Sequence, residues 1–479
     1  MATYKAIYSL KRSLKRSALS WVTKMRRVIR ILVAEEVPSL NKGEEEILIG
    51  ILDCFKSIGP CVMSVLSFFP EVDAPRYTRW DIEVLNAPHD FLILADIRNR
   101  SLPIKLVLSG LVFMRILVFI LLARLLKRRV LKVFRRPFWE AFYYSDVIVM
   151  CHDGVGIFDA EFLPLFTLYM ALAAKFMKKT MLFLSSGGVL PVEYLRTHRF
   201  VFSPLVQIGL WLGKAAVKMA DLIVTRDTYS YKLLRKALKG DGALYTATDT
   251  AFLARSLPKD GKSNQSLKEI LDFIKSAKKP LVGITLTREA LDMMNERYSS
   301  DFIAKFIDVL LDQLGASVLF IPHGYEPYLN DVMTALEIHE QVRHKHHTKV
   351  ITAELEFYEL RRIIGELDIL ITSRLHAAID AILQGVPFIF ITSSKDTRRQ
   401  VIIDAGFGSW IHLIDRHSAD ELLSRVDNLW LVRDKVKEFV KRKRREVLEK
   451  AILTVKLIRL TLLRKKNNLD LNSYRSSPV

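Results

Sequence analysis

The stretch "LDILITSRLHAAIDAILQGVPFIFIT" at residues 367–392 decides the fold of this chain. A short apolar run leads into a helical pattern that begins near Leu375, and a second apolar run follows Gly385 and Pro387. Two buried strands that are joined by one crossover helix form a parallel pair. The stretch therefore predicts a parallel sheet that is covered by helices.

The same alternation of short apolar runs and helical patterns extends over most of the chain. In the second half the runs are "LVGITL" at 281–286, "ASVLFIP" at 316–322 and "KVIT" at 349–352. In the first half they are 28–33, 61–66, 80–85, 146–151, 180–185 and 221–226. This rhythm is typical of doubly wound sheets. We predict an α/β protein of two Rossmann-like domains with a GT-B-like arrangement, in which parallel sheets face each other across a cleft.

The composition of the chain shifts at several points, and these shifts predict its domain boundaries. A polar, turn-rich stretch around "SLPKDGKSN" marks a linker between the two halves. We expect a basic segment at 1–27, a first domain at 28–252 with a helical insertion at 88–140, the linker at 253–279, a second domain at 280–415, and C-terminal helices with a basic tail at 416–479.

The insertion contains a nearly continuous apolar run, "LVLSGLVFMRILVFILLA" at 106–123, which is followed at once by basic residues. A membrane span, a helix that lies in one leaflet and a helix buried in protein all fit this pattern. A span would place strands of one sheet on opposite sides of the bilayer, so we do not expect one. We favour peripheral contact with an anionic membrane surface, and a buried helix or a dimer contact stays the alternative.

The charge of the chain is strongly positive and unevenly spread. The formal net charge is +20, and the first 34 residues hold nine Lys and Arg and no acidic residue. No nucleic-acid reading element accompanies these charges, so we expect no nucleic-acid partner. The N-terminus also has no continuous apolar core of a secretory signal. These features favour a cytoplasmic protein at the cytoplasmic face of the membrane.

Neither a disulfide framework nor a metal site is predicted. The three cysteines, Cys54, Cys61 and Cys151, form no CxxC pair. The histidines of "HEQVRHKHH" at 339–347 lie in a charged stretch without matching acidic residues. An apolar fraction of 50% with 26% charged residues is typical of a globular enzyme or receptor.

The residues at 373–376 form the most suggestive motif. The start of a helix presents unpaired N–H groups that favour an anion. Ser373 is a natural N-cap there, Arg374 offers a planar fork of donors, and His376 adds a group that titrates near neutrality. The motif predicts an anion site with an acid beside it. An ordinary capped helix with local ion pairs explains the same residues.

The motif also resembles the polysaccharide pyruvyl transferase family, whose members carry "SRLH" at the start of a helix and "GxP" before the next strand. Further matches occur in order: "NKGEEEIL" at 41–48, "DLIVTRDTYSYKLL" at 221–234, "TDTAFL" at 248–253, "VGITLTRE" at 282–289 and "IPHGYE" at 321–326. The resemblance covers roughly residues 28–410. The chain departs from the family where "CHDGVGIFD" at 151–159 replaces a glycine-rich motif, and this departure affects the half expected to hold the acceptor.

The resemblance implies transfer of a pyruvyl group from phosphoenolpyruvate to two hydroxyls of a sugar, as a ketal, with release of phosphate. It needs no cofactor and no metal, and a lipid-linked glycan would suit the apolar insertion as acceptor. His376 is the expected general acid/base. Donor binding is expected from Arg226, Ser373, Arg374, Leu375, His376 and Lys395. Acceptor binding is expected from Asn41, Gly43, Glu44, His152, Asp153, Gly154 and His323.

Two other functions fit the predicted architecture. A GT-B glycosyltransferase would use a nucleotide sugar, with Glu354 or Glu356 placed to bind the ribose. A membrane-seated relative without catalytic activity would retain the fold only. The sequence does not identify the sugar. It also leaves the oligomeric state open, and a homo-oligomer is one of the possibilities.

Overall fold

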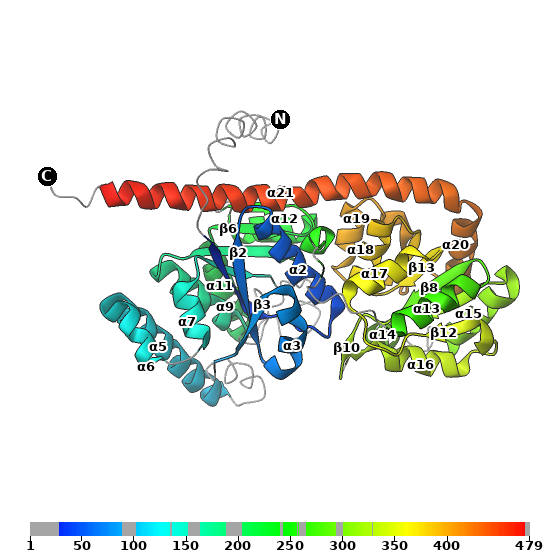
Figure 1. Cartoon of the computed structure of the whole chain (residues 1–479), viewed down its shortest axis with the longest axis horizontal. Coiled ribbons are helices and arrows are strands. Elements are labelled where there is room, and N and C mark those ends of the chain that lie inside the picture. The colour runs from blue at the N-terminus through cyan, green and yellow to red at the C-terminus, as the bar shows by residue number, and fades with distance from the viewer. Residues whose placement is uncertain are drawn as a thin grey trace.

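The computed structural model describes residues 28–88, 102–134, 137–151, 163–187, 204–239, 243–255, 257, 265–293, 300–327 and 329–474. Within these residues the chain forms two large parallel sheets, each covered by helices (Figure 1). The α/β class and the GT-B-like pair of Rossmann-like domains, which the apolar rhythm predicted, are therefore confirmed.

The first sheet has seven strands in the order β3-β2-β1-β4-β5-β6-β7, and all its pairs are parallel. Side chains of β1 alternate between two hydrophobic clusters, because successive residues of a strand point to opposite faces. The strands are β1 (Ile29–Glu36), β2 (Cys61–Ser67), β3 (Ile82–Asn86), β4 (Val147–Met150), β5 (Thr180–Ser186), β6 (Leu222–Thr225) and β7 (Leu244–Thr246).

Helices cover both faces of this sheet, and the insertion between β3 and β4 is helical, as predicted. It consists of α5 (Leu102–Leu126), η3 (Lys127–Arg129), α6 (Val130–Val133) and α7 (Pro137–Tyr144). Helix α5 buries Val112, Ile116 and Phe119 in the cluster that contains Ile148 of β4. The other elements of this half are α2 (Lys42–Lys56), α3 (Pro70–Tyr77), η1 (Thr78–Trp80), α9 (Leu163–Phe176), α11 (Pro204–Lys218), α12 (Thr228–Ala237) and η4 (Thr250–Leu253).

The second sheet has six parallel strands in the order β12-β9-β8-β13-β14-β15. Every residue of β8, β9, β13 and β14 is buried, as expected for strands covered on both faces. The strands are β8 (Leu281–Thr285), β9 (Ser317–Phe320), β12 (Thr348–Val350), β13 (Ile369–Thr372), β14 (Phe388–Thr392) and β15 (Ile411–Leu413), and β10 (Tyr325–Glu326) pairs with β11 (Leu329–Asn330) in a separate hairpin.

The helices of the second half begin inside the stretch that was expected to be a linker. Helix α13 lies there and buries Ile270 and Ile274 in the core, because its apolar residues recur at helical spacing. The remaining elements are α13 (Gln265–Ser276), α14 (Arg288–Met293), α15 (Ser300–Leu314), α16 (Asp331–Gln341), η6 (Lys345–His347), α17 (Phe357–Gly365), α18 (Leu375–Gln384), α19 (Arg399–Asp404), η7 (Gly408–Trp410) and α20 (Ala419–Leu431).

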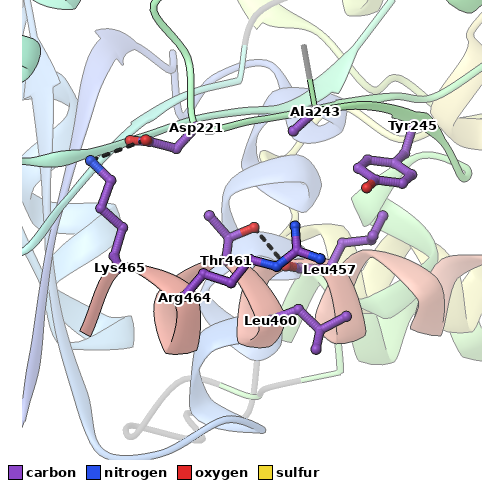
Figure 2. A pocket seen from close by; sticks show the side chains of 8 residues that line it. All are labelled: Asp221, Ala243, Tyr245, Leu457, Leu460, Thr461, Arg464 and Lys465. Carbon is purple, nitrogen blue, oxygen red and sulfur yellow. Dashed lines mark hydrogen bonds and ion pairs between the residues drawn. The ribbon is translucent and has the colours of Figure 1, made fainter. Parts of the chain in front are cut away.

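The last helix, α21 (Arg433–Tyr474), joins the two halves (Figure 1). It starts beside the second domain and runs back across the first, where Lys465 Nζ lies 3.0 Å from Asp221 Oδ1 (Figure 2). A cavity of about 210 Å³ lies between this helix and the edge of the first sheet. Its lining is Asp221, Ala243, Tyr245, Leu457, Leu460, Thr461, Arg464 and Lys465, and it holds none of the predicted site residues.

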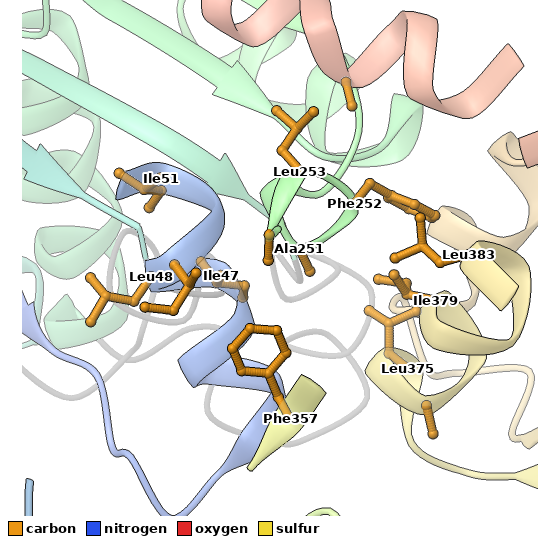
Figure 3. Close-up of a cluster of buried hydrophobic side chains, with 14 of the residues drawn as sticks. Ile47, Leu48, Ile51, Ala251, Phe252, Leu253, Phe357, Leu375, Ile379 and Leu383 are labelled. Carbon is orange, nitrogen blue, oxygen red and sulfur yellow. The ribbon is translucent and has the colours of Figure 1, made fainter. Parts of the chain in front are cut away.

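The two domains share one hydrophobic cluster (Figure 3). Helix α2 and η4 of the first domain pack against α17 and α18 of the second. Side chains that meet there are Ile47, Leu48 and Ile51 from α2, Ala251, Phe252 and Leu253 from η4, Phe357 from α17, and Leu375, Ile379 and Leu383 from α18. This contact fixes the start of α2 beside the start of α18.

Candidate active site

The start of α18 is held in place by its backbone. Arg374 is the N-cap residue, and its N–H donates to Thr372 Oγ1 at 2.9 Å. Ser373 was predicted to be the N-cap, and this prediction is wrong. The Ser373 hydroxyl is buried and accepts a hydrogen bond from the Thr287 N–H at 3.0 Å, so it joins α18 to the loop after β8.

The loop before α2 joins the first domain to the second. Asn41 caps α2 through its side chain, which accepts from the Gly43 N–H. The Lys42 N–H donates to the His323 carbonyl at 2.9 Å, and the Tyr325 N–H donates to the Leu40 carbonyl at 3.0 Å. Segments "NKG" and "PHGY", which lie far apart in the sequence, therefore form a short backbone pairing at the domain boundary.

A cavity of about 50 Å³ lies at this boundary, where the carboxyl ends of β9, β13 and β14 converge. Eight residues line it: Asn41, Gly43, Glu44, His323, Arg374, Leu375, His376 and Arg398. Seven of them are among the residues that the sequence singled out. Arg398 is the residue that the sequence reasoning missed, although the basic "KDTRR" after β14 contains it.

Close packing fixes the His376 ring. A Cβ atom on Gly43 would lie 2.1 Å from His376 Nδ1, which is far inside van der Waals contact. Only glycine at this position leaves room for the imidazole as it stands. Gly43 of the "NKG" segment therefore leaves the space that the His376 ring occupies.

Behind His376 lies Asp249, from the "TDTAFL" segment of the first domain. Oδ2 of Asp249 is 3.8 Å from His376 Nε2 and 3.2 Å from Arg226 Nη1. The side chains of Asp249 and Arg226 are fully buried, whereas 14% of the His376 side chain is exposed. Gly187 makes room for the guanidinium, because a Cβ there would lie 2.2 Å from Arg226 Nε. The arrangement links the arginine to the histidine through one carboxylate.

Arg226 was predicted to bind the donor directly, and the structure places it elsewhere. Its guanidinium is buried against Asp249 and is not part of the cavity lining. The next residue, Asp227, is the N-cap of α12, and its carboxylate accepts a hydrogen bond from the Ser230 N–H at 2.6 Å. Lys395 is exposed and also lies outside the lining. Ser373 lies outside it too, because its hydroxyl faces Thr287.

The guanidinium of Arg374 lies against Asp331 at the cavity wall. Nε and Nη2 of Arg374 donate to the two carboxylate oxygens of Asp331 at 3.0 Å and 2.8 Å. The same carboxylate accepts from the backbone N–H groups of His323 and Gly324. The planar fork that was expected to bind phosphate is therefore occupied by a protein carboxylate, and Arg374 keeps a fixed orientation at the cavity.

Three predicted acceptor residues, His152, Asp153 and Gly154, lie outside the described residues. The other predicted acceptor residues, Asn41, Gly43, Glu44 and His323, all line the cavity. Among the residues that the structure describes, no group of three or more His, Cys, Asp or Glu side chains could hold a metal ion.

A cluster of buried ionic side chains lies next to His323, which lines the cavity. Arg361 of α17 pairs with Asp380 and with Glu46, whose Oε1 lies 3.3 Å from Arg361 Nη2. Burial raises the pKa of Glu46 well above its usual range, and the charge of Asp380 adds to this effect. His323 Nε2 lies 3.8 Å from Asp380 Oδ2. This cluster holds α2, α17 and α18 together by charge as well as by apolar contact.

A second ionic cluster joins the domains through Lys42, whose side chain is fully buried. Its Nζ lies 3.1 Å from Glu45 Oε2 and 3.0 Å from Glu354 Oε1. Arg76 Nε also donates to Glu354, and Arg79 pairs with Glu356. Glu354 and Glu356, the two candidates for a ribose contact in a nucleotide-sugar enzyme, are thus both bound to cations of the first domain.

The family model of polysaccharide pyruvyl transferase matches residues 68–395, which is more than half of the chain. The chain belongs to this family. The match contains the Arg226, Asp249, His323 and Arg374–His376 segments, and it begins after the Asn41 loop. Membership of the family supports the coarse prediction of a pyruvyl transferase.

Solved structures with a similar fold come from other enzymes. A UDP-GlcNAc 2-epimerase from Neisseria meningitidis, bound to UDP-GlcNAc, has a TM-score of 0.54 at 14% identity and covers 91% of this chain and 99% of its own. A UDP-glucose: anthocyanidin 3-O-glucosyltransferase in complex with UDP has a TM-score of 0.51 at 10% identity and covers 92% and 100%. At these identities the likeness concerns the fold alone.

Proposed function

We propose that this protein transfers the pyruvyl group of phosphoenolpyruvate to two hydroxyls of a sugar and forms a cyclic ketal. The observation that carries the proposal is the position of His376, which lies on the cavity wall with Asp249 behind it in a chain of the pyruvyl transferase family. The sugar belongs to a cell-surface glycan, and a lipid-linked form of it suits the apolar face described below.

The chemistry balances without a cofactor. A proton adds to the methylene carbon of phosphoenolpyruvate and makes it a methyl group, so the neighbouring carbon becomes electrophilic. One sugar hydroxyl adds to that carbon, and the second replaces phosphate by breaking its C–O bond. Two hydroxyl protons are released in all: one balances the proton on the methyl group and the other leaves with phosphate.

In this scheme His376 donates the proton to carbon and accepts one from an attacking hydroxyl. Asp249 orients the imidazole and stabilises its protonated form, and buried Arg226 holds Asp249. We expect the Asp249–His376 distance of 3.8 Å to shorten to a hydrogen bond when substrate binds, since catalytic contacts tighten in the bound complex. Arg226 thus acts through Asp249.

The charges of the donor need cationic partners, and two arginines line the cavity. Arg374 is fixed by Asp331, and Arg398 lines the cavity with its guanidinium beside Asp396. The first turn of α18 adds N–H groups and the positive end of its dipole. A cavity of this size has room for a few water molecules, or for one compact anionic group such as a phosphate.

The acceptor side of the cavity belongs to the first domain. Glu44 and Asn41 line it there, and Glu44 lies in the first turn of α2, where its carboxylate can accept a hydrogen bond from a sugar hydroxyl. We propose that these two residues position the acceptor.

A nucleotide sugar is the alternative donor, because the solved structures of similar fold carry UDP or UDP-GlcNAc. Against it, Glu354 and Glu356 are engaged by Lys42, Arg76 and Arg79 and are not available to a ribose.

Thermal unfolding distinguishes the two donors, because a ligand that binds only the folded state raises Tm. Phosphoenolpyruvate should raise the Tm of the full-length chain, and UDP-GlcNAc and UDP-glucose should leave it unchanged. The Arg398→Ala variant should show a smaller rise with phosphoenolpyruvate. A rise with a UDP sugar alone would favour the glycosyltransferase and reject the proposal.

A further inference from the structure

Helix α5 carries one apolar face that no part of the described chain covers. The exposed large apolar residues of this face recur at alternating intervals of three and four, which places them in one line along the helix. They are Ile104, Val107, Leu111, Met114, Val118, Leu121 and Leu125, and each is between 42% and 69% exposed. We name these seven residues the α5 stripe.

The opposite face of α5 packs on the protein. Val112, Ile116, Phe119, Ile120 and Ala123 are buried in the cluster that covers the first sheet. Within Val107–Lys132 an 18-residue window has a mean hydropathy of 2.2, so the segment is apolar and long enough to cross a membrane, yet 33% of that window is buried inside the protein. One side docked on the sheet and one side exposed is the arrangement of a helix that lies flat at a surface.

The charge beside the α5 stripe selects its occupant. Residues 102–134 contain seven Lys and Arg and no Asp or Glu. Six of the seven are exposed: Arg115, Arg124, Lys127, Arg128, Arg129 and Lys132. Five of these six, from Arg124 onward, lie at the C-terminal end of α5 and beyond. Arg124 and Arg128 also lie over the aromatic rings of Phe176 and Tyr144, which keeps their guanidinium groups near the same surface.

A second copy of α5 would offer these cations no carboxylate partner, because residues 102–134 contain no Asp or Glu. An anionic bilayer supplies the opposite charge together with an apolar interior. We propose that the α5 stripe inserts into the interface of an anionic lipid bilayer, with α5 parallel to the membrane plane and the cations of 124–132 among the lipid headgroups.

This geometry gives the protein a fixed orientation on the membrane. Helix α5 belongs to the first domain, whose residues Asn41 and Glu44 line the acceptor side of the cavity. A lipid-linked acceptor would then approach the domain that sits on the bilayer. This last step rests on the proposed function, whereas the membrane contact does not.

Vesicle flotation of the full-length chain tests the contact. The protein should float with vesicles of phosphatidylcholine mixed with phosphatidylserine, and much less with phosphatidylcholine alone. The triple variant Leu111→Ser, Met114→Ser and Leu121→Ser should lower binding at least tenfold, because three apolar side chains that would insert into the bilayer are replaced by polar ones. Arg128→Ser with Arg129→Ser should lower binding to the anionic vesicles about fivefold per residue and reduce its sensitivity to salt.

The matched control changes Met333→Ser in the second domain and Leu431→Ser at the end of α20, which are both exposed apolar residues, and binding should stay at the wild-type level. Equal binding by wild type and stripe variant would overturn the proposal, because another segment would then carry the contact. Absence of wild-type flotation would also overturn it. A third result would overturn it as well: the wild type sediments as a dimer and the stripe variant as a monomer. A second copy of the chain would then cover the α5 stripe.

The orientation has its own readout. Single cysteines at positions 104, 114 and 125, in a background with Cys61→Ser, can carry a fluorophore that spin-labelled lipids quench. A helix parallel to the membrane gives the same shallow depth at all three positions. A deep centre between two shallow ends would show a spanning helix and reject the proposed geometry.

Discussion

The Nε2 atom of His376 lies 3.8 Å from Oδ2 of Asp249, and the two residues come from different domains. The carboxylate is fully buried and also pairs with Arg226. The contact between the two domains therefore places the Asp249 carboxylate beside His376. In the proposed reaction this pair sets the orientation and the charge of the general acid.

Asp249→Asn should lower the rate of pyruvyl transfer on the order of 10²-fold, because an amide neither stabilises an imidazolium nor fixes its tautomer. The pH–rate profile should move to lower pH for the same reason. Kinetics of the single and double variants check the link to His376.

In a His376→Ala background the same Asp249→Asn change should cost almost nothing further, because the two residues act as a unit. Additive losses in the double variant would mean that Asp249 serves the fold and not His376. Asp249→Asn also leaves Arg226 buried without its carboxylate, so its Tm should be recorded beside the rates.

Gly43→Ala should displace the His376 ring, since the added methyl would lie 2.1 Å from Nδ1. A displacement of this kind costs roughly 100-fold in rate. Gly110→Ala is the control, because a Cβ at Gly110 meets nothing within 4 Å. Wild-type turnover by Gly43→Ala, with an unchanged Tm, would contradict the position that we assign to the imidazole.

Arg398→Ala should raise the KM for phosphoenolpyruvate about tenfold, the effect of about 1.4 kcal/mol, and should alter kcat less. Lys395→Ala is the matched comparison, because Lys395 is exposed and lies outside the cavity. Steady-state kinetics with both variants check the prediction. A larger rise in KM for Lys395→Ala than for Arg398→Ala would show that Lys395 binds the donor, as the sequence suggested, and would contradict the role of Arg398.

Stability should depend on pH through Glu45. Burial raises the pKa of this carboxyl to about 7, while the charge of Lys42 pulls it down. A raised folded-state pKa favours the fold below the ordinary value near 4.5, and that stability is lost as pH rises through about 7. Burial raises the pKa of Glu354, but the hydrogen bonds and the positive charges of Arg76 and Lys42 outweigh it and hold this pKa at about 2, so the contribution of Glu354 to stability is lost only in stronger acid.

Tm should therefore fall between pH 5 and pH 8 in the wild type, and Glu45→Gln should flatten this fall. Glu366→Gln, at an exposed position, is the control and should follow the wild-type curve. Parallel curves for wild type and Glu45→Gln would show that Glu45 does not titrate in this range.

Local sequence patterns were sufficient to predict the alternating strands and helices and the residues at the ends of the strands. The segments around His323 and Arg374 follow β9 and β13 of one parallel sheet, so their meeting at one edge follows from the topology, whereas Asn41 follows β1 of the other sheet and reaches the cavity through the domain contact. The same reasoning placed the helical insertion, whose apolar residues interrupt the strand rhythm of the first half.

Contacts between distant segments could not be predicted. Asp331 accepts hydrogen bonds from the Arg374 guanidinium, and Asp249 contacts both Arg226 and His376. These partners lie far apart in the sequence, so no local pattern indicates the contacts. Ser373 has the residue type of an N-cap, yet Thr287 of a neighbouring loop competes for its hydroxyl. The path of α21 across both domains also depends on tertiary contacts such as Lys465 with Asp221.

Transfer of label from phosphoenolpyruvate tests the central claim most directly. Wild-type protein, phosphoenolpyruvate labelled in its pyruvyl carbons and a glycolipid extract from the source membranes are incubated together, and labelled glycolipid and free phosphate are measured. We predict equal amounts of both products, and a loss of about 10² to 10⁴ in rate for His376→Ala with its Tm unchanged. No labelled glycolipid with the wild type, or full transfer by His376→Ala, would contradict the account.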